Sequence, residues 1–275
     1  MSTSKLKNIV IAGLVFINVF FLAAISLSSI GESSERRGIL SDLRTVFESS
    51  GIRLAGELPS SSESLRPLSA ERDAFGEAAI ARAALGECAP SGDGGARALY
   101  TGERGAAEFN ARGEFKIEFA EPYSPRGDVS SATKRLLRDM GIDAAAPALS
   151  ESGGIVTATS VFLYKGAPAF NCAISFEFED GRLLRVTGRR PSGIKDAPAA
   201  SLRSLPTALL GFLTFARGGG TDCSEIASVT AGYRFAVSAF GEGALSPGWL
   251  LDTDAGGYFI DASTGEVLSS DAPAA

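Results

Sequence analysis

The most suggestive spacing of chemically active residues lies near the C-terminus, where Asp252, Asp254 and Gly256 alternate along the chain. Alternating aspartates begin the loops of EF-hand calcium sites, which also need Gly at the sixth position and a bidentate Glu at the twelfth. Gly257 does fill the sixth position, but Gly256 fills the fifth and Ser263 the twelfth, so two oxygen ligands are missing. We therefore interpret this segment as a hairpin turn between two strands.

Two other patterns also fall short of a reactive site. Gly218–Gly220 is not followed by the Lys-Ser/Thr pair of a phosphate-binding loop. The carboxylates Glu177, Glu179 and Asp180 alternate with phenylalanines, which is typical of the solvated face of a strand. Carboxylate pairs for glycoside hydrolysis cannot be recognised from spacing alone. The sequence thus predicts no catalytic residues, no cofactor and no metal site.

The chain contains no histidine. This absence removes Ser-His-Asp and Cys-His catalysis, histidine-type zinc sites and the usual switch at physiological pH. We therefore expect that the protein is not an enzyme.

The composition of residues 32–275 is acidic, with all 32 of the acidic residues but only 24 of the 26 basic ones. A basic, nucleic-acid-binding surface is not expected from such a balance. The three cysteines, Cys88, Cys172 and Cys223, are widely spaced and form no CxxC pair. They are interpreted as small buried hydrophobes, with a single disulfide as the alternative.

A 23-residue stretch without charge, Asn8–Ile30, follows a short segment that contains Lys5 and Lys7. About 20 apolar residues suffice for a helix to cross a bilayer, and lysines on one side favour the cytoplasm for that end. We therefore predict a cytoplasmic N-terminus (1–7), a transmembrane helix (8–30) and an extracytoplasmic remainder. The alternative is a cleaved signal peptide, although its apolar region is usually only about 7–15 residues long.

Asn18 lies near the centre of the predicted transmembrane helix. A polar amide in hydrocarbon seeks a hydrogen bond from a neighbouring helix, which contributes about 0.5–2 kcal/mol. Apolar residues share its helical face, and we predict that this face binds another transmembrane helix; the residues are Ile11, Leu14, Val15, Leu22 and Ile25.

The remainder is predicted to fold as two α+β units, each a helix followed by an antiparallel meander, at 32–146 and 147–275. Helical periodicity covers Glu35–Ser50, Glu71–Leu85, Val129–Met140 and Ala199–Arg217. In the second of these helices Phe75, Ala79 and Ile80 are expected on one apolar side. Asp128 is the expected N-cap of the third, and Pro206 favours a later start for the fourth. Strand patterns cover Ile52–Leu58, Arg97–Thr101, Ala107–Ala111, Glu114–Phe119, Gly154–Tyr164, Ala169–Glu179, Arg182–Gly188, Ser224–Phe240 (broken near Gly232), Pro247–Thr253, Gly257–Asp261 and Glu266–Ser269. Lys165-Gly166 and Asp180-Gly181 are typical hairpin turns.

Two segments carry a resemblance to a known family. The anchor contains Phe16–Leu22, and the C-terminal part contains Leu245–Trp249 and the run Gly257–Val267. Together with the order of anchor, amphipathic helix and outer α+β region, they resemble the YycI/YycH family of accessory proteins of a Gram-positive two-component system. The run that ends in Thr264-Gly265-Glu266 also resembles the end of PepSY-like units.

The resemblance implies a membrane-tethered regulator without enzymatic activity. Its implied partners are a sensor histidine kinase, contacted through the transmembrane helix and the outer domain, and a YycH-like sister protein. Two alternatives remain open. One is a PepSY-like inhibitor or chaperone of an extracytoplasmic protease, and the other is a carboxylate-based envelope enzyme.

Overall fold

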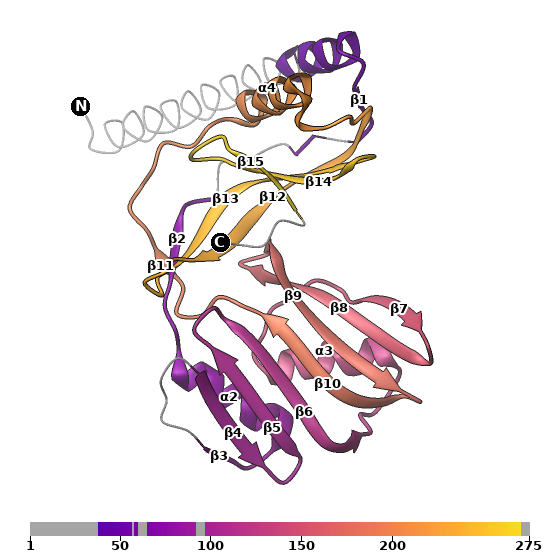
Figure 1. Ribbon diagram of the computed structural model, residues 1–275, viewed down its shortest axis with the longest axis vertical. Coiled ribbons are helices and arrows are strands. Elements are labelled where there is room, and N and C mark those ends of the chain that lie inside the picture. Colours follow the sequence, from indigo (N-terminus) through magenta and orange to yellow (C-terminus); the bar gives the residue numbers. More distant parts are fainter. Residues whose placement is uncertain (1–37, 57, 60–64, 92–96, 271–275) are drawn as a thin grey trace, which may run out of the picture. The chain divides into compact units, whose positions relative to one another are not determined.

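The computed structural model describes residues 38–56, 58–59, 65–91 and 97–270 (Figure 1). It divides into two compact units, residues 1–54 and 55–275. The predicted cytoplasmic N-terminus, the transmembrane helix 8–30 and the face around Asn18 lie outside the described residues. Among the residues that are described, no helix has the length and apolar character needed to cross a bilayer.

The described part of the first unit is a helix over 38–49 followed by the short strand β1 (Arg53–Leu54). Leu43 and Phe47 are buried at the i, i+4 spacing of one helical face. Gly51 ends the helix with a φ of +82°, and Ile52 N–H then donates to Phe47 O at 3.0 Å. The predicted helix is confirmed over its described residues, whereas the predicted strand over 52–58 shortens to two residues.

The second unit is an α+β fold, as the sequence predicts. Its helices are α2 (Ala74–Leu85), α3 (Val129–Asp139), α4 (Leu205–Phe215) and the short π-helix η1 (Ala216–Gly220). Its strands are β2 (Leu68–Ala70), β3 (Cys88–Pro90), β4 (Arg97–Gly102), β5 (Gly105–Asn110), β6 (Glu114–Tyr123), β7 (Ala148–Ser152), β8 (Ile155–Tyr164), β9 (Ala167–Glu179), β10 (Arg182–Arg189), β11 (Lys195–Asp196), β12 (Glu225–Val237), β13 (Gly243–Thr253), β14 (Gly256–Asp261) and β15 (Val267–Ser269).

The helices begin and end where local chemistry favours it. Asp128 caps α3 by accepting a hydrogen bond from Ser131 N–H at 2.8 Å, as predicted. Ser204 caps α4, and Pro206 occupies its first turn, where the missing N–H has no helical partner in any case. The regular helix therefore starts close to Pro206 rather than at Ala199.

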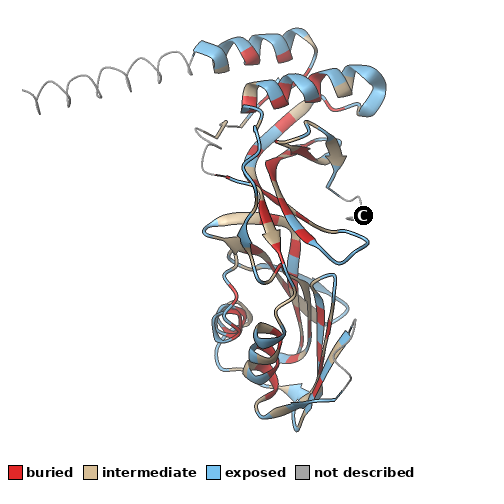
Figure 2. Cartoon of the chain, turned by 90° about the vertical axis from the view of Figure 1, so that its left-hand side faces the viewer, coloured by how far each residue is buried: buried red, intermediate tan, exposed pale blue. Residues whose placement is uncertain are grey.

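One continuous hydrogen-bonded path links the strands in the order β11-β2-β13-β12-β9-β10-β6-β5-β4-β3. β6 pairs antiparallel with β10, so strands from both sides of the predicted boundary near Pro147 share a sheet. Helices α2 and α3 lie on one face of the part that contains β3 to β10 (Figures 1 and 2). Buried residues of both helices and of these strands form a common core. The division into 32–146 and 147–275 stays a prediction.

The C-terminal strands form a second region of pairing around β13, which contacts β12, β14 and β2. Helix α4 packs there, since Phe212 and Phe215 lie 5.5 and 5.9 Å from the Tyr258 ring, measured between centroids. The hairpins at Lys165-Gly166 and Asp180-Gly181 are confirmed, because all four of their residues have positive φ.

The predicted break near Gly232 is wrong, because β12 runs through it without interruption. A Cβ at Gly232 would meet Pro168 O and the Phe170 ring, the latter at 2.6 Å. The absence of a side chain at Gly232 therefore allows β9 to approach β12 closely, and the strand does not bend there. Its cross-strand partner on β13 is Gly248.

Strand β9 joins the two regions of the sheet. Towards its C-terminus it pairs with β10, and near its N-terminus it meets β12 in parallel at the single pair Ala169–Tyr233. Two residues further along each strand, the side chain of Asn171 on β9 takes the place of backbone pairing with β12. Asn171 Nδ2 donates to Phe235 O at 2.7 Å, and Asn171 Oδ1 accepts from Phe235 N–H at 2.9 Å. Asn171 thus satisfies both backbone groups of a buried residue.

All three cysteines are free thiols. Cys172 and Cys223 are buried and Cys88 is partly exposed, so the interpretation as buried hydrophobes is confirmed for two of the three. Burial raises the pKa of the Cys172 thiol to about 12.

Replacing Asn171 with Leu is expected to lower the free energy of unfolding by about 2–4 kcal/mol, because a buried N–H and C=O of Phe235 lose their partners. Urea denaturation of the full-length variant measures the change. Ser175→Ala on the same strand is the control, since that hydroxyl bonds another side chain, Thr159 Oγ1 at 3.2 Å, and no backbone group within the described residues. Equal losses in the two variants would contradict the assigned role of Asn171.

Thiol reactivity should follow burial. At pH 8 the folded protein is expected to react quickly with Ellman's reagent at Cys88 and slowly at Cys172, whose raised pKa keeps it protonated. In denaturant all three should react at similar rates. Mass spectrometry of the modified peptides identifies the thiols, and fast labelling of Cys172 in the folded chain would refute its burial.

Candidate functional site

A cleft in the second unit is lined by charged and polar side chains from four segments. Its walls include Arg72 and Glu77 near the start of α2, Arg190 after β10, and Phe235 on β12. Asn110, at the end of β5, also lines it. We call this the arginine cleft, because two guanidinium groups face it.

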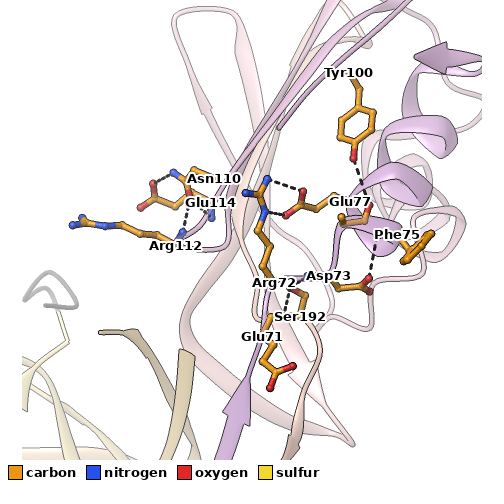
Figure 3. Close-up of polar contacts among 11 residues, drawn as sticks. Glu71, Arg72, Asp73, Phe75, Glu77, Tyr100, Asn110, Arg112, Glu114 and Ser192 are labelled. Atoms are coloured by element: carbon orange, nitrogen blue, oxygen red, sulfur yellow. Dashed lines mark hydrogen bonds and ion pairs between the residues drawn. The ribbon is translucent and has the colours of Figure 1, made fainter. Parts of the chain in front are cut away.

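The start of α2 carries a nearly buried ion pair. Asp73 caps the helix by accepting from Phe75 N–H at 3.1 Å. One turn on, the Glu77 carboxylate accepts from Arg72 Nε at 2.8 Å and from its Nη2 at 3.1 Å, a two-pronged pairing that Figure 3 shows. The Glu77 side chain is only 7% exposed. The hydrogen bond from Arg72 to Glu77 raises the pKa of the arginine.

This pair corrects the helical face that the sequence predicts. Phe75 was expected on the buried side with Ala79 and Ile80, yet it is 91% exposed. Glu77 takes a buried position instead, together with Ile80 and Ala84. An apolar pattern cannot reveal this exchange, because Glu77 is tolerated inside only through its bond to Arg72.

The segment after β10 is tied to the segment before α2 through Ser192. Its hydroxyl donates to Glu71 O at 3.1 Å and accepts from Asp73 N–H at 3.3 Å (Figure 3). Glu71 N–H in turn donates to Ser192 O at 3.0 Å. These bonds fix the two walls of the cleft against each other.

A second wall is the turn between β5 and β6. Asn110 Oδ1 accepts from Arg112 N–H and Glu114 N–H, which holds the turn closed. Gly113 takes a φ of +77° there and accepts from Arg190 N–H at 2.9 Å. A Cβ at Gly113 would collide with Arg190 O, so the glycine permits this contact.

Arg190 differs from the other charged groups of the cleft. Its guanidinium makes no hydrogen bond or ion pair with any residue in the described part of the chain. Burial lowers the pKa of Arg190, and the nearby carboxylates of Asp73 and Glu77 act in the opposite direction. A Cβ built on Gly76 would lie 3.0 Å from Arg190 Nη2, so the glycine leaves room for the cation beside α2.

The cleft continues into a groove between β2 and the hairpin that joins β12 to β13. Ala70, Arg72 and Gly243 line both. Phe240 at the hairpin tip also lines the groove and is 94% exposed. Phe235, at the base of the same hairpin, is buried and lies 4.9 Å beneath the Arg189 guanidinium carbon.

The predicted hairpin near the C-terminus is confirmed: Asp254 lies in the turn between β13 and β14, and Asp252 belongs to β13. The Asp254 carboxylate accepts from Ser224 N–H, Ser224 Oγ and Glu225 N–H, which fastens the turn before β14 to the start of β12. The bond from Ser224 lowers the pKa of Asp254. In the described part of the chain, no three Cys, Asp or Glu residues are grouped as a metal site.

Chemically, the arginine cleft is suited to binding. A guanidinium that lacks a partner attracts an anion, and its planar donors match a carboxylate. Burial raises the pKa of Tyr100, whose hydroxyl donates to Ala74 O at 3.4 Å, so this phenol stays neutral. The hydroxyls of Ser192 and Tyr100 are therefore held by backbone oxygens rather than activated.

The site residues predicted from sequence all lie outside the described residues, so the predicted helix–helix contact stays a prediction; they are Asn18, Leu14, Val15, Leu22 and Ile25. Sequence reasoning missed Arg72, Glu77 and Arg190. For Arg190, a local signal is present in the sequence: the pair Arg189-Arg190 stands at the end of a strong strand pattern, directly before Pro191.

Comparisons with known proteins give limited similarity. No family model and no curated protein sequence matches the chain. An uncharacterized protein from Eubacterium rectale is similar in structure, with a TM-score of 0.43 and 8% identity, over 74% of this chain and 86% of that one. The Bacillus megaterium YpeB C-terminal domain has a TM-score of 0.37 and 12% identity, over 73% and 98% of the respective chains. Likenesses at this level carry no inference about partners.

Neutralising Glu77 tests the ion pair at the start of α2. Glu77→Gln is expected to lower the free energy of unfolding by about 2–3 kcal/mol, since Arg72 loses its carboxylate in a nearly buried place. The matched control is Glu108→Gln, which breaks the exposed pair with Arg97 and should change stability by less than about 1 kcal/mol. Chemical denaturation of both variants provides the values, and equal losses would contradict the assignment.

Proposed function

We propose that this protein is a membrane-anchored, extracytoplasmic regulator that acts by contact with another protein rather than by catalysis. The observation that carries the proposal is the arginine cleft, which offers an unpaired cation and an adjoining groove without an activated nucleophile. Arginine and aromatic side chains are enriched where proteins bind one another. Arg190 and Phe240 are such residues, and both line this continuous surface.

The proposed partner is a sensor histidine kinase of the cell envelope, with a YycH-like sister protein beside it. Support for this partner comes from the resemblance of the anchor and of the C-terminal run to the YycI/YycH family. Residues 8–30 would hold the chain in the membrane, with the N-terminus in the cytoplasm. The Asn18 face would then contact a transmembrane helix of the kinase while the outer domain contacts its extracytoplasmic part.

Regulation by contact requires a difference in affinity. If the protein binds one signalling state of the kinase more tightly than the other, it shifts the population toward that state. The shift can be no larger than the ratio of the two affinities. Neither a cofactor nor a chemical step is needed for such an effect.

Co-purification of the full-length chain from its native membranes tests the partner. Mass spectrometry is expected to identify a histidine kinase, and Asn18→Leu should reduce its recovery several-fold by removing the interhelical amide. Ala23→Leu, on the opposite side of the same helix, is the control. Recovery of a protease or hydrolase without a kinase would contradict the proposal and favour the PepSY-like alternative.

A further inference from the structure

Arg190 is the cation in the cleft that the described residues leave without a bonded carboxylate. Arg72 is paired with Glu77, and Lys195 is paired with Glu71 at 2.7 Å. Asp73 caps α2 by accepting from Phe75 N–H through Oδ1, and its carboxylate acts on Arg190 through space, without a hydrogen bond or ion pair in the described part of the chain. Keeping an unpaired guanidinium partly buried costs free energy, and a bound anion would lower that cost.

The position of Arg190 is held by the backbone and not by its own charge. Its N–H donates to Gly113 O, and Ser192, two residues on, is bonded to Glu71 and Asp73. Gly76 leaves free the space that the guanidinium occupies beside α2. The cation is therefore preorganised, which reduces the entropy lost when a ligand binds.

The charges around Arg190 select the kind of anion. Asp73 and Glu77 act on Arg190 electrostatically and raise its pKa, and the same two charges repel a doubly charged phosphate more strongly than a singly charged carboxylate. A carboxylate carries a single charge and matches the fork of the guanidinium. The groove that leads away from the cleft to Phe240 has room for an extended chain with apolar side chains.

We propose that the arginine cleft binds a carboxylate of a peptide segment of the partner, with Arg190 as its anchor and Phe240 packing against a neighbouring apolar side chain. This inference rests on the proposed function, because it names the chemistry by which the outer domain recognises its partner. The carboxylate comes from an Asp or Glu side chain or from a chain end, and both sources present the same group to Arg190.

Binding of peptide pools to the full-length chain in lipid nanodiscs tests this recognition. Three fluorescent pools of otherwise neutral hexapeptides are used: one with a free C-terminal carboxylate, one amidated with a central Asp, and one amidated with a central Asn. Fluorescence anisotropy is expected to show at least tenfold tighter binding of one or both carboxylate pools than of the Asn pool. The pool that binds identifies the source of the carboxylate.

Two variants locate the binding. Arg190→Gln should abolish the preference for the carboxylate pools, and Phe240→Ser, at a 94% exposed position, should weaken all pools without affecting folding. Arg182→Gln, at the exposed start of β10, is the charge-matched control and should behave as the natural chain. Circular dichroism confirms that each variant is folded.

Several results would overturn the inference. They are equal binding of the three pools, a carboxylate preference that survives Arg190→Gln, or tighter binding of a fourth, amidated pool with a central phosphoserine than of the Asp pool. The proposed function fails separately, when no kinase co-purifies from membranes. If the carboxylate pools bind preferentially but no kinase co-purifies, carboxylate binding by the cleft is supported and the proposed kinase partner is rejected.

Discussion

The joint between β9 and β12 is the contact on which the described fold of the second unit depends. The two strands meet at one backbone pair, Ala169–Tyr233, and the Asn171 side chain then takes the place of the next one. Its two hydrogen bonds fix Phe235, whose ring lines the arginine cleft and lies beneath Arg189. The same joint thus holds β12 and β13 onto the sheet and places their hairpin beside Arg190.

Charge pairing explains why Arg190 is the group of the cleft that is expected to bind an anion. In the part of the chain that the structure describes, most charges of the cleft compensate one another, as in the bidentate contact of Arg72 with Glu77. Arg190 is positioned by backbone bonds instead, so its charge remains available. An acidic protein can therefore still recognise an acidic group, because the local arrangement outweighs the net charge at contact distance.

Much of the secondary structure could be predicted from the sequence, because it follows from local rules. Asp128 as a helix cap, Pro206 at a helix start and the Asp180-Gly181 turn are set by neighbouring residues alone. Gly232 was misjudged, since its role is to admit β9, a strand more than fifty residues away. The cleft was missed for the same reason: Arg72, Asn110 and Arg190 meet only through sheet pairing. The predicted site around Asn18 lies outside the described residues.

Hydrogen exchange of the full-length chain, with and without the partner that co-purifies with it, measures most directly whether the arginine cleft is the contact surface. Binding of the partner at the cleft should slow exchange in three separate peptides, covering residues 70–77, 190–192 and 236–243. These segments are distant in sequence, and all three line the cleft or its groove. Protection confined to other parts of the outer domain, such as the exposed strand β7, with unchanged exchange in these three segments, would contradict it.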